Sequence, residues 1–228
     1  DRPAVGHTEP MPFTASHAVV ALPFVRGPLP YGAVAVGSMA PDLPLFFPVA
    51  ISYGTTHGFP SLLLTSLPLA LLLYLVWRML LRPAASALLP RTIGERLPAG
   101  WARDWRVPAR DIPLIVLSLL IGVATHVVWD AFTHPGRFGS ALIPALAGRW
   151  GPFDGTQWLQ YVSSAAGLLI VAVVAARHLA RSESAPFAPR PRIRLAYWTS
   201  LLVSAAVGLV VAVATLGIPS GTRAAKLF

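Results

Sequence analysis

Four long stretches of the chain are nearly free of charge, and each is close to the roughly 20 residues that cross the hydrocarbon core of a bilayer. They cover residues 61–81, 112–132, 158–176 and 195–218. Hydrophobic residues make up 55% of the chain and charged residues 12%, against roughly 25% charged in a soluble domain. The sequence therefore predicts an all-α protein, a polytopic membrane helical bundle with about four strong transmembrane helices.

Two segments near the amino end depart from this pattern. Residues 1–10 are polar and contain two prolines, so we expect an extension or expression remnant ahead of a single membrane domain at residues 11–228. Residues 31–53 are apolar apart from Asp42, but Pro41, Pro44 and Pro48 interrupt them. Proline inside a helix kinks or stops it. We predict a proline-broken or re-entrant helical segment here, packed against protein.

Arginine-rich loops indicate the orientation. The net charge of +9 is almost entirely arginine. Loops 78–110 and 177–194 hold seven and five arginines, whereas residues 133–157 hold only Arg137 and Arg149. The positive-inside rule places the two rich loops in the cytoplasm. Because these arginines flank apolar runs, we expect the lipid bilayer as the partner and no nucleic acid.

An ionisable motif stands at the end of the second stretch. At helical spacing, His126, Asp130 and His134 project from nearly one face. Ionisable groups at membrane depth are costly to desolvate and indicate function. The chain has no cysteine, so a metal ion would take His, Asp, Glu or backbone oxygen ligands.

Three further polar residues lie in apolar surroundings: His17, Asp42 and His57. Under the predicted orientation, His57 and the end of the second stretch share the outer side. The candidate metal ligands are therefore His17, Asp42, His57, His126, Asp130 and His134. The alternatives are local ones: a helix-end residue at His17, a turn former at Asp42, a surface loop at His57, and a buried hydrogen-bonded pair of His126 with Asp130.

Smaller features accompany these ligands. Hydroxyl residues precede four of the histidines, and they either orient the imidazoles or bond back to helix carbonyls. They are Ser16, Thr56, Thr125 and Thr133. His7 and His178 are expected to be solvated. Trp129, Trp150 and Trp158 are typical of interfacial aromatics.

Longer motifs resemble a known family. They run Met11-Pro12-Phe13-Thr14-x-Ser16-His17, Gly37-Ser38-Met39-Ala40-Pro41-Asp42-Leu43-Pro44, Thr56-His57 and Thr125-His126-x-x-Trp129-Asp130-x-Phe132-Thr133-His134-Pro135. This pattern resembles DUF4184, an uncharacterised bacterial membrane family, over nearly the whole chain. The resemblance implies the bacterial cytoplasmic (inner) membrane.

The order of the ligands is similar, more distantly, to that of inner-membrane metal-dependent hydrolases of the YdjM type and of zinc-dependent phospholipase C. That similarity implies His17, Asp42, His57, His126 and Asp130 as ligands, with Asp130 as a candidate bridge. The zinc enzymes also use a second His-x-x-x-Glu pair, but His178 is followed by Ser182. One or two ions are therefore expected.

We expect a metal-dependent hydrolase that acts on a phosphoester or lipid-like substrate at the outer membrane face. Zinc is the first choice of metal, with manganese or iron as alternatives. Asp42 or Asp130 would be the base that orients water, and His134 a ligand or a general acid. Arg137 and Arg149 are either phosphate contacts or ordinary surface arginines. The alternative function is a non-catalytic metal-binding membrane protein, a transport or scaffold component.

Overall fold

The computed structural model describes residues 14–46, 51–98, 101, 107–185 and 191–216, which are predominantly helical. The expected extension at residues 1–10 lies outside them. The chain divides into two compact units, one of residues 1–80 with 104–182 and one of residues 81–103 with 183–228. The single domain expected for residues 11–228 stays a prediction. All six candidate ligands lie in the first unit.

Three helices in the described residues are long and apolar enough to cross a membrane: Ser61–Leu88, Ala109–Thr133 and Gly155–Arg181. The first comprises α4 (Ser61–Leu64), α5 (Ser66–Val76), the π-helical turn η3 (Trp77–Leu81) and α6 (Arg82–Leu88). The second comprises the 3₁₀ turn η4 (Ala109–Asp111) and α8 (Ile112–Thr133), and the third is α11 (Gly155–Arg181). The predicted helical membrane fold is thereby confirmed for three of the four stretches.

The fourth stretch lies in the second unit, which contains α6, α7 (Arg91–Gly94) and α12 (Pro191–Leu216). Residues 195–216 of that stretch form one continuous helix within α12, and residues 217–218 lie outside the described chain. A membrane crossing by α12 stays a prediction.

The amino-terminal third is broken into short helices, as its prolines predicted. The elements are η1 (Thr14–Phe24, 3₁₀), α1 (Tyr31–Gly37), η2 (Ala40–Asp42, 3₁₀), α2 (Leu43–Phe46) and α3 (Tyr53–His57). Pro41 stands inside η2, where a 3₁₀ turn replaces the α-helix. Each break redirects the chain, so that Asp42 and His57 stand at the ends of separate elements.

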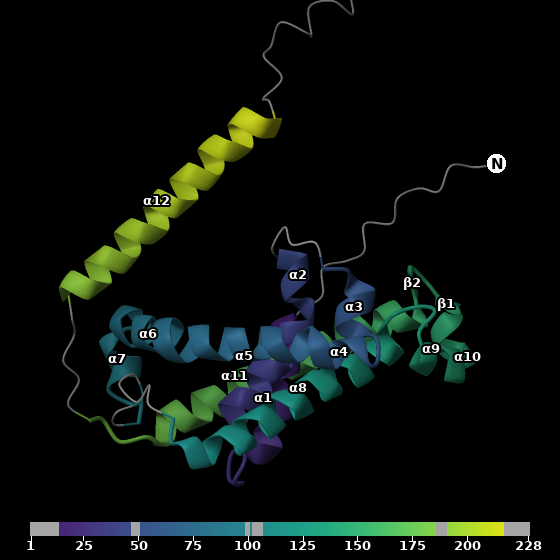
Figure 1. Ribbon diagram of the computed structural model, residues 1–228, viewed down its shortest axis with the longest axis horizontal. Helices are drawn as coiled ribbons and strands as arrows, with labels where there is room; N and C mark the ends of the chain where they lie inside the picture. Colours follow the sequence, from purple (N-terminus) through teal and green to yellow (C-terminus); the bar gives the residue numbers. More distant parts are fainter. Residues whose placement is uncertain (1–13, 47–50, 99–100, 102–106, 186–190, 217–228) are drawn as a thin grey trace, which may run out of the picture. The chain divides into compact units, whose positions relative to one another are not determined.

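A close crossing of α1 and α8 forms the centre of the first unit (Figure 1). A Cβ on Gly122 would lie 2.3 Å from the carbonyl oxygen of Val34, and one on Gly37 would lie 2.3 Å from that of Leu119. Only glycine permits such an approach of two backbones. Around the crossing lie the buried apolar residues Ala33, Val36, Ala40, Ala70, Tyr74, Ile115, Leu119 and Val123.

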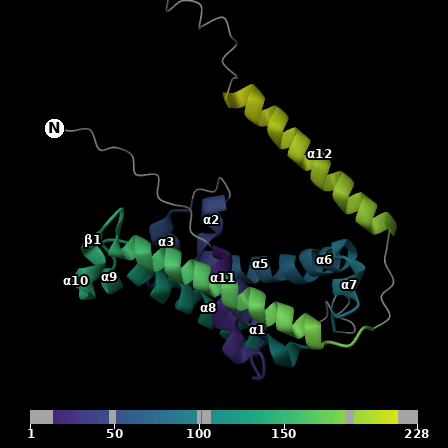
Figure 2. The same cartoon turned by 180° about the vertical axis from the view of Figure 1, so that it is seen from behind.

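Helix α11 packs on η1, and Figure 2 shows it from the opposite side. A Cβ on Gly167 would lie 3.0 Å from the carbonyl oxygen of Ser16. Helix α11 begins after Asp154, whose backbone N–H donates to the side-chain oxygen of Gln157 at 3.1 Å. This packing holds the part of η1 that carries His17.

Several small elements follow α8: α9 (Phe138–Leu142), α10 (Pro144–Ala147) and a hairpin of β1 (Arg149–Trp150) with β2 (Phe153–Asp154). The antiparallel strands pair Arg149 with Asp154 and Trp150 with Phe153. Gly151 turns the hairpin at a φ of 68°. Helix α9 packs on α8, because a Cβ on Gly139 would lie 2.7 Å from the carbonyl oxygen of Ala131.

Candidate metal centre

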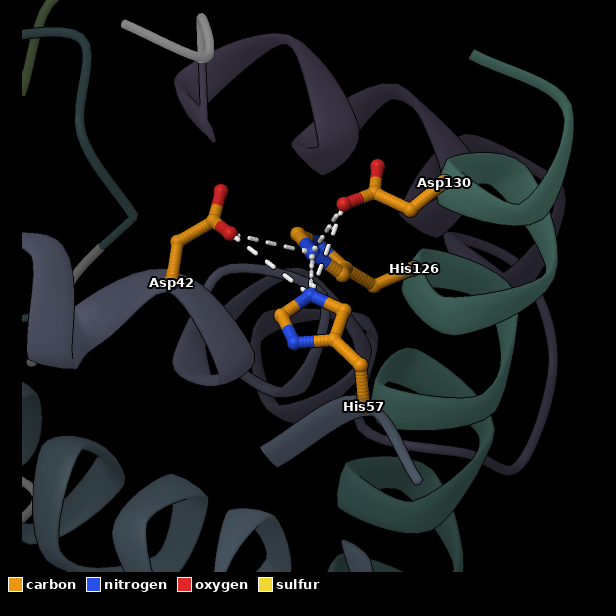
Figure 3. A group of neighbouring side chains, drawn as sticks. All are labelled: Asp42, His57, His126 and Asp130. Carbon is orange, nitrogen blue, oxygen red and sulfur yellow. Dashed lines mark hydrogen bonds and ion pairs between the residues drawn. The ribbon is translucent and has the colours of Figure 1, made fainter. Parts of the chain in front are cut away.

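Four buried side chains converge where three elements meet: Asp42 from η2, His57 from α3, and His126 and Asp130 from α8 (Figure 3). One ligand atom of each lies within 4.8 Å of all the others, so the group could hold a metal ion. Asp42 and His126 are fully buried. Burying two carboxylates among imidazoles costs several kcal/mol per uncompensated charge, which makes a purely structural role expensive.

Backbone carbonyls face one ring nitrogen of both imidazoles. Nδ1 of His126 lies 2.7 Å from the carbonyl oxygen of Ser38, and Nδ1 of His57 lies 3.1 Å from that of Tyr53. A carbonyl oxygen only accepts, so Nδ1 of His126 carries a proton, and Nε2 is the nitrogen that each imidazole turns towards the carboxylates. The two Nε2 atoms are 3.2 Å apart. This separation suits two nitrogen ligands of one metal ion.

The spacing of the four ligand atoms fits a single ion. Bonds of about 2.0–2.2 Å to zinc separate tetrahedral ligands by roughly 3.3–3.6 Å. Nε2 of His126 lies 3.3 Å from one carboxylate oxygen of each aspartate, and Nε2 of His57 lies 3.4 Å from Asp130 and 3.8 Å from Asp42. Oδ1 of Asp42 is buried and accepts no hydrogen bond from the described residues. A buried carboxylate oxygen without a hydrogen-bond donor is suited to bind a metal ion.

Two hydroxyl groups that the sequence did not single out hold the carboxylates. Thr14 donates to Oδ2 of Asp42 at 2.6 Å, and the Tyr53 phenol donates to Oδ2 of Asp130 at 2.8 Å. Tyr53 stands one helical turn before His57, and its ring stacks on the imidazole at 3.7 Å. That spacing of four residues was a signal available in the sequence. Burial raises the pKa of Tyr53, and the Asp130 carboxylate adds to the effect, so the phenol stays a donor.

His17 lies at the edge of the group. Its Nε2 atom is 3.7 Å from Oδ1 of Asp130, and its ring centroid is 4.2 Å from that of His126. Burial, with the neighbouring His126 imidazole, lowers the pKa of His17 from 6.5 to about 4. The side chain is thus a neutral imidazole at neutral pH. It faces the second oxygen of Asp130, as the predicted bridging role requires.

His134 follows directly after α8, four residues beyond Asp130. Helix α8 ends at Thr133, and His134 has extended backbone angles. Its Nδ1 atom still lies 3.7 Å from Oδ2 of Asp130 and 3.3 Å from the Asp130 carbonyl oxygen. His134 therefore contacts Asp130 from beside the four central residues, whose ligand atoms all lie within 4.8 Å of one another.

Two of the hydroxyl residues before the histidines meet both expectations, because Thr56 donates to the Tyr53 carbonyl oxygen at 3.0 Å and Thr133 to that of Trp129 at 3.4 Å, and both also face an imidazole. Thr56 Oγ1 lies 2.8 Å from Nδ1 of His57, and Thr133 Oγ1 lies 3.2 Å from Nδ1 of His134. Thr125 instead donates to the helix carbonyl of Gly122 at 2.8 Å. His178, expected to be solvated, is exposed on α11, and His7 lies outside the described residues.

The two loop arginines have different surroundings. The guanidinium carbon of Arg137 lies 4.7 Å from the centroid of the Tyr53 ring, beside the centre. Arg149 is exposed and donates to the Pro152 carbonyl oxygen within the hairpin. Trp129, Trp150 and Trp158 are all exposed. Only one of the two arginines therefore reaches the group of candidate ligands.

Fold and site together define a helical protein with three helices apolar enough for a membrane and a buried His/Asp group that could hold a metal ion. Residues 11–226 match the family model described as "Domain of unknown function (DUF4184)". The chain belongs to this family, as its motifs predicted. No curated protein and no solved structure is found to match it.

Proposed function

We propose that the protein is an integral membrane metal-dependent hydrolase that acts on a phosphoester or lipid-like substrate. The observation that carries this proposal is the pair of imidazoles, whose Nε2 atoms lie 3.2 Å apart between two carboxylates. Both imidazoles are already oriented by backbone carbonyls. Such fixed orientation of metal-binding histidines is what a preformed metal site requires.

The proposed ion is bound by Asp42, His57, His126 and Asp130. Zinc suits imidazole and carboxylate ligands, with manganese or iron as alternatives. When bound, a divalent ion acidifies a coordinated water and neutralises charge on departing oxygens. One ion fits the spacing of the four central ligand atoms. A second ion between Asp130 and His17 would have only those two residues as nearby ligands among the described contacts.

The chain's own residues supply the acid and base. Oδ2 of Asp42 accepts a hydrogen bond from Thr14, whereas Oδ1 of Asp130 lies 3.7 Å from Nε2 of His17 and accepts no hydrogen bond from the residues that the structure describes. Asp130 is therefore the better placed base to orient water, and Asp42 serves as a ligand. His134 is partly exposed beside Asp130 and is assigned as the proton donor to the leaving group.

The lipid-like character of the substrate is supported by exposed aromatic residues next to the centre. Phe59 follows His57 by two residues and is 81% exposed, and Phe138 follows Arg137 and is 75% exposed. Apolar side chains at such positions fit the boundary between headgroups and acyl chains. We place the protein in the bacterial inner membrane with loops 78–110 and 177–194 in the cytoplasm and the site towards the outer face.

A non-catalytic metal-binding protein is the second candidate, and one observation favours it. Four protein ligands would fill a tetrahedral zinc site, which is the arrangement of structural zinc sites, whereas catalytic sites keep one position open. Two polar groups that are not central ligands nevertheless lie beside the centre: His134 and Arg137. A closed structural site has no need of them, which favours the hydrolase.

Two experiments test the proposal. Metal content is measured on detergent-purified protein, with His126→Ala and Asp130→Ala beside the exposed control His178→Ala. We expect about one ion per chain in the parent and the control and a near-complete loss in the two site variants. A metal-free parent, or full metal content in both site variants, would falsify the metal centre.

Metal-loaded protein is then screened against phosphomonoesters, phosphodiesters and phospholipids, each with and without chelator. Chelator-sensitive turnover that disappears in His126→Ala supports the hydrolase. A loaded protein without any such turnover supports the non-catalytic alternative.

A further inference from the structure

Arg137 lies one side chain away from the proposed ion. Its guanidinium carbon is 4.7 Å from the centroid of the Tyr53 ring. The same ring stacks on His57 at an interplanar angle of 17°, and its phenol donates to Asp130. A cation over a tyrosine ring is attracted by the negative face of the ring. Tyr53 thus connects the guanidinium of Arg137 to two of the central ligands.

Three backbone features hold Arg137 in this place. Gly136 turns the chain at a φ of 71°, which favours glycine. The N–H of Arg137 donates to Oγ of Ser140 at 3.1 Å, and that hydroxyl donates to the Arg137 carbonyl oxygen at 2.9 Å. The close contact of Gly139 with Ala131 joins this turn to the end of α8. These contacts fix the loop that carries Arg137 to the end of α8, beside the candidate metal centre.

The guanidinium has unused hydrogen-bonding capacity. It carries five N–H donors in a fixed fork, and Arg137 is half-buried. Among the residues that the structure describes, no carboxylate forms an ion pair with it. The ring of Tyr53 attracts the positive charge of Arg137 but does not accept hydrogen bonds from most of its N–H groups. An anion with several oxygens is the ligand that this fork suits best.

We infer that Arg137 binds the phosphate group of the substrate and positions it beside the ion. This inference rests on the proposed function and names one residue that selects its substrate class. Arg149, the other arginine of the loop, has no such role, because it is exposed and donates to the carbonyl oxygen of Pro152 within the hairpin. Arg137→Lys keeps the charge and loses the fork, so it separates attraction by charge from bidentate binding.

The test measures binding of inorganic phosphate to full-length, metal-loaded protein in a maltoside detergent, which contains no phosphate. Titration calorimetry is run on the parent, Arg137→Ala, Arg137→Lys and Arg149→Ala, with metal content determined on each sample. We expect the dissociation constant to rise roughly 10- to 100-fold in Arg137→Ala, as loss of hydrogen bonds to a charged group predicts. Arg137→Lys falls between that variant and the parent, and Arg149→Ala equals the parent.

Metal content and phosphate binding test the proposed function and the role of Arg137 separately. A parent that holds metal but binds no phosphate, or binds it equally after Arg137→Ala, overturns the inference and leaves the metal centre standing. A parent that holds no metal but loses phosphate binding on Arg137→Ala overturns the proposed function and leaves the role of Arg137 standing. A loss of metal together with phosphate binding in Arg137→Ala alone would assign Arg137 a structural role and also overturns the inference.

A second arm separates the two sources of phosphate. Phosphatidylglycerol is added to the maltoside micelles, and the titration with inorganic phosphate is repeated. If a lipid headgroup is the natural ligand, the added lipid competes and raises the apparent dissociation constant of the parent at least several-fold. If the ligand is a water-soluble phosphate ester, glycerol 3-phosphate competes and the lipid does not. Competition by neither compound contradicts a phosphate-binding role.

Discussion

Nε2 of His57 and Nε2 of His126 lie 3.2 Å apart, although 69 positions separate the two residues in the chain. The other ring nitrogen of each imidazole faces a backbone carbonyl, which orients the two Nε2 atoms towards one another. Two carboxylates, from Asp42 and Asp130, stand beside the pair. The backbone of α1 and α3 has thus fixed both ligands before any ion arrives, which lowers the cost of binding one.

The phenol of Tyr53 should tune this centre. Tyr53→Phe removes the donor to Asp130 but keeps the ring that stacks on His57. Loss of a group that supports a metal ligand typically weakens metal affinity about 10- to 100-fold. We expect a loss in this range in competition titrations with a chromophoric chelator, with Tyr31→Phe, at an exposed tyrosine, unchanged. Equal affinity in parent and Tyr53→Phe would show that the hydrogen bond has no role in metal binding.

The crossing of α1 and α8 should not tolerate a methyl group. Gly122→Ala places a Cβ 2.3 Å from the Val34 carbonyl oxygen, and helix backbones cannot yield as a flexible side chain does. Overpacking of this kind costs about 1–3 kcal/mol, and the shift of α1 would also move the Ser38 carbonyl away from His126. Thermal unfolding in detergent should show a clearly lower Tm. Gly32→Ala, with nothing within 4 Å of the added Cβ, is the control, and a Tm for Gly122→Ala at or above the control refutes the crossing.

The stability of the metal-free protein should fall with acidification, partly through His17. Burial and the His126 imidazole lower the pKa of His17 from 6.5 to about 4. Between these values the unfolded chain takes up a proton that the folded chain does not, so stability is lost as pH falls from about 6.5 towards 4 and is unaffected by His17 above that window. The full effect is on the order of a few kcal/mol.

Unfolding of chelator-treated parent and His17→Gln is followed from pH 7.5 to pH 5. The variant should lose less Tm than the parent over this range, while His178→Gln, at an exposed histidine, follows the parent. Parallel curves for parent and His17→Gln would mean that His17 is already protonated or fully solvated in the folded state.

The orientation can be read with single cysteines, because the chain has none of its own. Ala141→Cys lies in the loop assigned to the outer side, and Thr92→Cys lies in a loop assigned to the cytoplasm; both positions are exposed. A charged maleimide on intact cells should label position 141 at once and position 92 only after permeabilisation. The reverse order of labelling would invert the orientation and move the centre to the cytoplasmic face.

The long apolar helices and the six candidate ligands were predictable from the sequence for related reasons. An uncharged run of about 20 residues has few stable alternatives to a helix in a membrane. Asp130 in such a run, or Asp42 among prolines, is too costly to bury without a partner, so each one marks a site by itself. The tendency of an apolar run to form a helix and the cost of burying a carboxylate in it both depend on the residues of one segment, so the sequence of that segment is enough to predict them.

Which of the six residues meet was decided only by the tertiary structure. The orientation of His126 depends on the Ser38 carbonyl at the end of α1, and the close contact at Gly122 sets the distance of α1 from α8. His134 lies beside the group through its contact with Asp130, and the turn at Gly136 brings Arg137 to the Tyr53 ring. In a buried metal centre, ligand atoms from segments far apart in the chain must be positioned to within tenths of an ångström. Backbone packing supplies that precision, and no local pattern encodes it.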